Sequence, residues 1–334
     1  MFQGALTGCG SQTPSDILMI MSVRTTVPEK EIHVHEVSID SAQSDIAATF
    51  PNFKIDSIEP AGQGFTNIAF LVNGDYIFRF AKRSHASEQI NREVKLLPAL
   101  EPYVKLPIPH IEYAGKRKEN SFSFMGYKKI RGETPEKDVF DGLHEETKDK
   151  FTKEIAGFIS DVHTFPVEKA FSVGVELIEY KRKYQKEYEA TQRLIYPLVD
   201  VTTRDYLKNL FEAYLHDEHN FTYTATFNHA EVSPYHVIVD RSAKKITGVI
   251  DFGDMHVGDP DWDFNYFYNR YGKEYITNLL KYYRHSEPER LMKKLDFFAK
   301  YGELQAIFVG IRENEEELKR GLSMLQKRVA ANTV

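Results

Sequence analysis

The stretch FNHAEVSPYHVIVDRSAKKITGVIDFGDMHVGDPDWDF, residues 227–264, decides how the chain folds. Three short runs of β-branched or aromatic residues predict strands over 225–227, 237–239 and 246–250. Ionisable side chains flank these runs at four positions: His229, Glu231, His236 and Asp251. Carboxylates at the ends of neighbouring strands suit a divalent cation that also binds nucleotide phosphates. The stretch therefore favours phosphoryl transfer.

The order of motifs in this stretch resembles the aminoglycoside phosphotransferase family of kinase-like enzymes. The motifs that carry the resemblance are His229-Ala230-Glu231, His236, Asp251-Phe252-Gly253-Asp254 and Gly258-Asp259-Pro260-Asp261-Trp262-Asp263. The resemblance is strongest to the 2″-aminoglycoside phosphotransferases, which share a histidine at the position of His236. They also have segments similar in sequence to ITGVIDFGD at 246–254 and to the hinge-like GYKKIRG at 126–132.

The resemblance implies an α+β, bilobal, protein-kinase-like fold. A small antiparallel sheet lobe with one main helix would be followed by a larger, mainly helical lobe. We expect a loosely packed extension over 1–36, a nucleotide-binding lobe over 37–127, and a hinge with a catalytic and substrate-binding lobe over 128–334. The implied activity transfers the γ-phosphoryl group of GTP or ATP to a hydroxyl group of an aminoglycoside antibiotic, with Mg²⁺ as the metal.

By resemblance, Glu231 and His229 form the catalytic loop, and Asp251 and His236 form the metal site. Asp251 is the preferred ligand, because magnesium binds oxygen more readily than imidazole nitrogen. We expect His229 to brace the loop by hydrogen bonding rather than to transfer protons. The family carries Asp where this chain has Glu231. One extra methylene moves the carboxylate by about 1 Å, and a misplacement of that size can cost about 100-fold in rate.

The glycine-rich segment and the first strands are expected to hold the nucleotide. Gly62 and Gly64 precede a hairpin marked by Asn73-Gly74 and could bring backbone amides close to phosphate oxygens. Arg79, in the second hairpin strand, would pair with Glu93 of the following helix, as the strand cation and helix carboxylate do in kinases. Lys82 is the competing candidate for that cation.

At the hinge, the carbonyl of Lys128 and the amide of Ile130 would meet the purine edge of the nucleotide. By resemblance, Tyr127 is the gatekeeper residue, and its bulk favours guanine, which makes GTP the preferred donor and ATP the alternative. Asp254 and Glu313 are the candidates for binding the ammonium groups of a substrate. Because Glu313 belongs to an acidic helical run, a solvated surface is its ordinary interpretation. We expect Asp259 and Asp263 to cap or pin the helix that follows them.

Composition limits the other function classes. The 334 residues carry a net charge of −6, which argues against bulk nucleic-acid binding and is compatible with a cationic substrate. A single cysteine excludes a disulfide within the chain. No stretch approaches the roughly 20 apolar residues that span a bilayer. We therefore expect a cytoplasmic monomer.

Two alternatives stay open at this point. The chain could be a kinase for another small alcohol, such as a macrolide, choline or an amino acid. It could also be a nucleotide-binding pseudokinase, because Glu231 replaces the usual aspartate.

Overall fold

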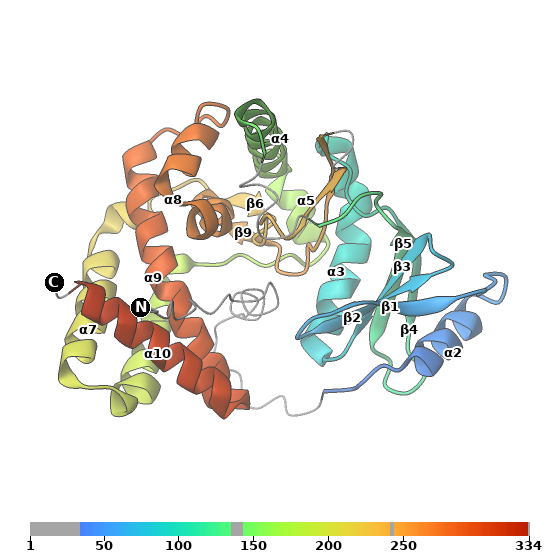
Figure 1. The fold of residues 1–334 in the computed structure, drawn as a ribbon, viewed down its shortest axis with the longest axis horizontal. Helices are drawn as coiled ribbons and strands as arrows, with labels where there is room; N and C mark the ends of the chain where they lie inside the picture. The colour runs from blue at the N-terminus through green and yellow to red at the C-terminus, as the bar shows by residue number, and fades with distance from the viewer. Residues whose placement is uncertain (1–33, 135–142, 241–243, 333–334) are drawn as a thin grey trace, which may run out of the picture.

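The computed structural model describes residues 34–134, 143–240 and 244–332. Figure 1 shows a small lobe built on a sheet beside a larger lobe built mainly of helices. The sheet has five antiparallel strands in the order β1-β2-β3-β5-β4. Helix α3 lies between the sheet and the large lobe (Figure 1). This arrangement confirms the predicted bilobal α+β fold.

The strands of the small lobe are β1 (Ile58–Gln63), β2 (Asn67–Val72), β3 (Tyr76–Ala81), β4 (Ile111–Lys116) and β5 (Ser123–Lys128). Two helices accompany them, α2 (Ile39–Thr49) and α3 (Ser84–Leu100). The predicted Asn-Gly turn joins β2 to β3 through residues 73–75, with φ of 55° at Asn73 and 72° at Gly74, the positive values that the two central residues of a type I′ turn require. Phe70, Phe78 and Phe80 then alternate into one core with Phe124.

The first strand begins later than the apolar pattern of the sequence predicts. That pattern predicts a strand over 53–60, but pairing with β2 starts at Ile58 and continues to Gln63. The apolar side chain of Phe53 packs edge-on against Tyr76 and Tyr113 without joining the ladder. The glycine-rich turn therefore connects β1 to β2.

Helices and short strands build the large lobe. The helices are α4 (Glu145–His163), α5 (Val167–Ser172), α6 (Tyr180–Ala190), α7 (Val201–His216), α8 (Asn265–Leu279), α9 (Pro288–Glu313) and α10 (Glu315–Asn332). The strands form two antiparallel pairs, β6 (Thr226–Asn228) with β9 (His256–Gly258) and β7 (Val237–Asp240) with β8 (Lys245–Val249). The three predicted strands are β6, β7 and β8, and β9 was not predicted.

Two helices have limits that differ from those the amphipathic pattern of the sequence predicts. The pattern predicts a helix from residue 175, but the helix begins only at Tyr180, because the preceding segment bonds to β9 through the amide of Ile178 and the carbonyl of Val257 (2.8 Å). The pattern also predicts one helix ending at 301 and another starting at 304, but α9 runs through this region with Gly302 accommodated in it. The chain instead leaves the helix at Asn314, which has extended backbone angles.

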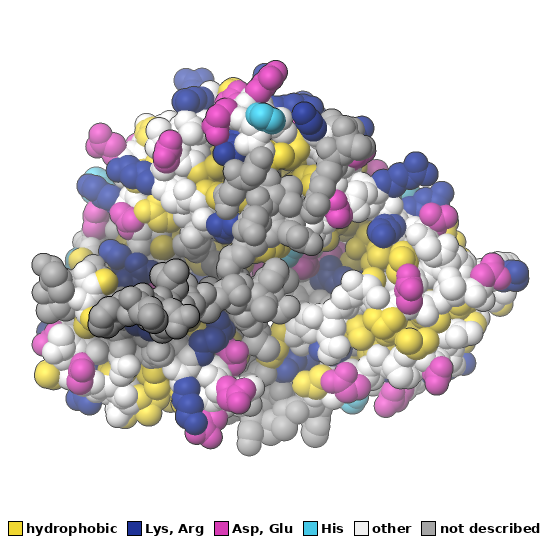
Figure 2. Space-filling view, in the orientation of Figure 1, with side chains coloured by type: hydrophobic (Ala, Val, Ile, Leu, Met, Phe, Trp, Pro, Cys, Tyr) yellow, Lys and Arg dark blue, Asp and Glu magenta, His cyan; other side chains and the backbone are white. Residues whose placement is uncertain are grey.

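The extension expected over 1–36 lies outside the described residues except for its last three. There, His35 donates its amide to the carbonyl of Lys82 (2.9 Å), so the end of this segment is joined to the small lobe. Within the described ranges, no helix combines the length and the apolar character needed to cross a membrane. Figure 2 shows acidic and basic side chains interspersed over the face that it presents.

The turn between α9 and α10 brings the two helices close at Gly310. A Cβ at this position would overlap the backbone N and Cα of Leu318 and lie 2.8 Å from its Cβ. We expect Gly310→Ala to destabilise the protein by about 1–3 kcal/mol, the usual cost of overpacking. Gly302→Ala on the same helix is the matched control, because no atom lies within 4 Å of its added Cβ. That control should gain about 1 kcal/mol from helix propensity. Urea unfolding of both variants measures the difference, and equal stabilities would contradict the close approach.

Candidate active site

Glu231, His236 and Asp251 converge between the two lobes. One potential ligand atom from each lies within 4.8 Å of the others. His236 Nε2 is 3.5 Å from Asp251 Oδ2. The three come from the loop after β6, from the residue before β7 and from the turn after β8. The sequence-predicted catalytic and metal-binding positions are thus brought together in space.

The backbone around this cluster adopts left-handed conformations. Ala230 has φ of 72° and Asp251 has φ of 68°, in a region that costs non-glycine residues on the order of 1 kcal/mol or more. Asp263 holds the first of these positions, because its carboxylate accepts the amides of His229 (3.0 Å) and Ala230 (2.6 Å). The indole of Trp262 donates to the carbonyl of Ala230 (3.1 Å). The catalytic loop is therefore fixed by the segment that follows β9.

His229 is fully buried and serves as a brace. Its Nδ1 accepts the amide of Glu231 (3.2 Å), so the proton resides on Nε2, which donates to the carbonyl of Ile250 (3.2 Å). Burial lowers the pKa of His229 to about 4 and outweighs the opposing effect of Asp263. The imidazole is consequently neutral at pH 7. This geometry agrees with the bracing role expected for His229.

His236 directs its second ring nitrogen towards Asp251. Its Nδ1 donates to the carbonyl of Glu231 (2.7 Å), and its Nε2 lies 3.5 Å from Asp251 Oδ2. Nε2 is buried and has no hydrogen-bond partner among the described residues. An orphaned nitrogen beside a carboxylate fits a metal site. Asp251 supplies an oxygen ligand of the kind that magnesium prefers, and His236 can complete or orient the set.

Arg79 links the small lobe to this cluster. Its guanidinium makes two contacts of 3.0 Å with Glu93 on α3 and one of 3.3 Å with Asp251. Burial raises the pKa of Glu93 to about 7, although Arg79 opposes the shift. Lys82 is also buried, but its charged neighbours are Glu36 and Arg83. The structure therefore brings Arg79, and not Lys82, to Glu93.

The carboxylates of the cluster titrate in opposite directions. Burial raises the pKa of Glu231 well above its ordinary value, and the negative charges of Asp254 and Asp251 raise it further. Burial opposes ionisation of Asp251 as well, but the positive charge of Arg79 and the interaction with His236 outweigh it and lower the pKa of Asp251. Arg79 therefore favours the ionised form of Asp251 over that of Glu231.

Two polar residues of the site carry no sequence signal. Gln89 on α3 donates its amide to Asp254 (2.7 Å), so one oxygen of the residue expected to face a cationic substrate already has a partner. Tyr266 donates its hydroxyl to Glu231 (3.4 Å). Neither residue belongs to a recognisable motif. Only their placement on α3 and α8, next to the 251–254 turn and the catalytic loop, reveals them.

The residues predicted to contact nucleotide lie in the small lobe and in its connection to the large lobe. A Cβ added to Gly62 in β1 would have no atom within 4 Å. A Cβ added to Gly64 would meet only the carbonyl oxygen of Asn67, at 3.8 Å. Tyr127 is buried at the end of β5, where burial raises its pKa to about 12 and Arg79 opposes the shift. Lys128 ends β5 and Ile130 follows it in the connection to the large lobe. Glu313 is the last residue of α9, and its side chain lies outside the described structure.

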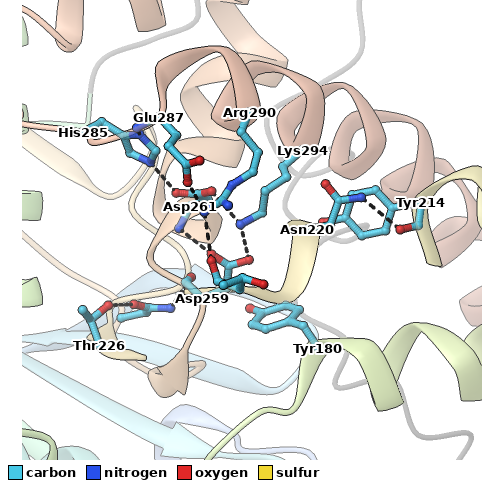
Figure 3. Close-up of polar contacts among 12 residues, drawn as sticks. Tyr180, Tyr214, Asn220, Thr226, Asp259, Asp261, His285, Glu287, Arg290 and Lys294 are labelled. Carbon is cyan, nitrogen blue, oxygen red and sulfur yellow. Dashed lines mark hydrogen bonds and ion pairs between the residues drawn. The ribbon is translucent and has the colours of Figure 1, made fainter. Parts of the chain in front are cut away.

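Behind the catalytic loop, the GDPDWD motif is held by a buried lysine (Figure 3). Lys294 Nζ on α9 lies 2.5 Å from Asp259 and 2.6 Å from Asp261. His285 Nε2 is 2.8 Å from Asp261. Asp259 accepts the amide of Asp261 and caps the short 3₁₀ helix Pro260–Phe264, as expected for a pinning residue. Asp263 differs from that expectation, because its carboxylate points back to the catalytic loop.

Comparison with known proteins agrees with this geometry. A family model described as the phosphotransferase enzyme family APH matches residues 57–298. The chain belongs to this family. A solved structure of the GDP and kanamycin complex of APH(2″)-IIIa is 32% identical, with a TM-score of 0.83 over 88% of this chain and 99% of that one.

Two further similar proteins extend the comparison. The streptomycin and ATP ternary complex of APH(2″)-IIa is 25% identical, with a TM-score of 0.72 over 87% of this chain and 97% of that one. The uncharacterized protein YcbJ of Bacillus subtilis (strain 168) is 23% identical over 140 residues, which are 42% of this chain and 44% of that protein. The resemblance stated from the sequence is thereby confirmed, and the chain is a kinase-like phosphotransferase by family.

Proposed function

We propose that this APH-family chain transfers the γ-phosphoryl group of GTP or ATP to a hydroxyl group of an aminoglycoside. The observation that carries the proposal is the convergence of Glu231, His236 and Asp251 beside the Arg79–Glu93 pair. Relatives solved with GDP and kanamycin, and with streptomycin and ATP, support the two substrate classes. The negative charge of the chain suits a cationic acceptor.

Each residue has a role that follows from its contacts. Glu231, held by Tyr266, positions the acceptor hydroxyl and takes its proton. Arg79 carries the fixed positive charge that binds phosphate oxygens, and Glu93 orients it. Asp251 would hold Mg²⁺ with His236, and the metal would supply positive charge to the transferring phosphates. The open glycine turn at Gly62 and Gly64 covers the phosphate chain.

The donor is proposed to be GTP, with ATP as the alternative. Tyr127 is a large buried side chain at the hinge, and its bulk narrows the pocket for the base. The GDP complex of a 32% identical relative supports a guanine nucleotide as the donor. Relatives solved with ATP and ADP support an adenine nucleotide as the alternative.

Replacing Glu231 tests the proposal directly. We expect the native chain to release nucleoside diphosphate when an aminoglycoside is added, and Glu231→Gln to turn over at least about 100-fold more slowly, because general-base contributions are about 10²–10⁴-fold. Steady-state nucleotide turnover with GTP and ATP, over a panel of aminoglycosides and macrolides, measures both. Nucleotide affinity is the control and should be unchanged, since Glu231 acts on the acceptor.

Glu231→Asp separates an enzyme from a nucleotide-binding scaffold. Turnover that is absent in the native chain and restored by Glu231→Asp would mark a degenerate catalyst. Nucleotide binding with no turnover in either form would refute the proposed activity and support the pseudokinase alternative. Turnover with macrolides but not with aminoglycosides would support the alternative that the chain is a kinase for another small alcohol.

A further inference from the structure

Four aromatic rings surround the ammonium group of Lys183 in the large lobe. Its Nζ lies 4.8 Å from the ring centroid of Trp262, 5.4 Å from Tyr180, 5.6 Å from Tyr301 and 5.7 Å from Tyr184. Three elements supply these rings, α6, the short helix Pro260–Phe264 and α9. Such an aromatic box is a typical binding site for an ammonium group, because each ring presents its negative face to the cation.

The aromatic box adjoins the catalytic loop. Trp262 donates its indole N–H to the carbonyl of Ala230, the residue before Glu231. Tyr180 donates its hydroxyl to His256 Nε2 (2.8 Å), and His256 Nδ1 is 3.1 Å from the carbonyl of Asp254. Asp254 is close enough to Lys183 to oppose the lowering of its pKa by burial. The box therefore lies beside the acidic residue that the sequence assigned to the acceptor.

A buried carboxylate lies next to Lys183. Glu187 is one helical turn further along α6 and only 3% exposed. Burial raises the pKa of Glu187 to about 7, and the charge of Lys183 and a hydrogen bond with Tyr301 oppose the shift. The hydroxyl of Tyr184 and the Oε1 atom of Gln305 have no hydrogen-bond partner among the described residues. These groups accept hydrogen bonds, so an ammonium group in the box would find acceptors beside it.

We propose that the aromatic box and Glu187 form an ammonium-binding subsite of the acceptor pocket, and that Lys183 is a specificity-determining residue because its own ammonium fills this subsite. This inference rests on the proposed function and deepens it. An acceptor amine that enters the box must displace Lys183, whose flexible four-carbon stem allows it to withdraw. Acceptors rich in amines are therefore disfavoured relative to those that present only hydroxyl groups there.

Lys183→Ala removes the ammonium group together with the stem that carries it, and so vacates the box. We expect it to tighten binding of kanamycin by about tenfold, the effect of one desolvated cation–π contact. The matched control is Lys186→Ala, which removes an exposed lysine from the same helix and should leave binding unchanged. The chain has one tryptophan, so the fluorescence of Trp262 reports directly on the box.

A second variant separates the subsite from a packing effect. Adding Glu187→Gln to Lys183→Ala should abolish the tenfold gain, because the vacated box then lacks its carboxylate. The dissociation constant for nucleotide should stay the same in all variants. A kanamycin affinity that is measurable in both forms and is unchanged or weakened in Lys183→Ala, with nucleotide binding intact, would overturn the inference.

Methylammonium distinguishes this failure from failure of the proposed function. It is a small probe that can enter the box without the rest of an aminoglycoside. Saturable quenching of Trp262 by methylammonium in Lys183→Ala, but not in the native chain, supports the subsite even if kanamycin binds to neither. Binding of neither probe to Lys183→Ala refutes the subsite. Turnover of aminoglycosides by the native chain then decides the proposed function separately.

Discussion

Replacing Lys294 by methionine is expected to destabilise the folded protein by about 3–5 kcal/mol, the cost of breaking a buried ion pair. Lys294 is fully buried and is the cation that contacts both Asp259 and Asp261. Without it, two adjacent carboxylates stay buried with only His285 beside one of them. Because Asp259 and Asp261 belong to the segment that holds the catalytic loop, lost stability should be accompanied by lost turnover.

Urea unfolding monitored by circular dichroism measures this effect. Lys293→Met is the matched control, since Lys293 is the exposed neighbour on the same helix and should change stability by no more than about 0.5 kcal/mol. Combining Lys294→Met with Asp259→Asn and Asp261→Asn should recover much of the loss, because no uncompensated charge then remains. A single Lys294→Met variant as stable as the control would show that the lysine contributes little.

Replacing Asp251 by asparagine is expected to lower turnover by about 1000-fold. A metal ion contributes several kcal/mol of charge stabilisation in the transition state, and about 4 kcal/mol corresponds to three factors of ten. Asp251 is the carboxylate of the cluster whose pKa is lowered, so it is the ionised ligand. The substitution preserves the shape of the side chain but removes the charge that faces Arg79 and His236.

Two measurements separate loss of the metal site from loss of the fold. Circular dichroism and the melting temperature should show that Asp251→Asn remains folded. Titration of Mn²⁺, followed by electron paramagnetic resonance in the presence of nucleotide, should show weaker binding to Asp251→Asn than to the native chain. Asp75→Asn, an exposed substitution in the β2–β3 turn, is the control for charge alone. Turnover of Asp251→Asn within tenfold of the native rate would contradict the assigned role.

The fold was predictable because local signals and the family motifs agree. Asn73-Gly74 predicted the hairpin that the structure contains, and the apolar periodicity of 145–165 predicted α4. The predicted ends of helices and strands were wrong where tertiary contacts override the local sequence pattern. Residues 175–179 read as helix, yet they bond to β9, a strand of three residues that is too short for a periodic signal.

The residues of the candidate site could be predicted from the sequence where they belong to a family motif. The motifs indicated Glu231, His236 and Asp251, and the structure brings their side chains together. The supporting residues could not be found in this way. Lys294 lies more than 30 residues from its two carboxylate partners, and Gln89 is 165 residues from Asp254. No local pattern encodes contacts of that range, because helix packing alone brings these residues together.

The left-handed backbone at Ala230 and Asp251 bears on how this protein would lose its activity during evolution or heating. Such conformations persist only while the surrounding structure enforces them. Asp263 and Lys294 behind it provide that enforcement at Ala230, although neither of them is assigned a contact with nucleotide or acceptor. Variants screened for loss of the proposed phosphoryl transfer should therefore often carry changes at these two positions, in molecules that still appear native by their helix content.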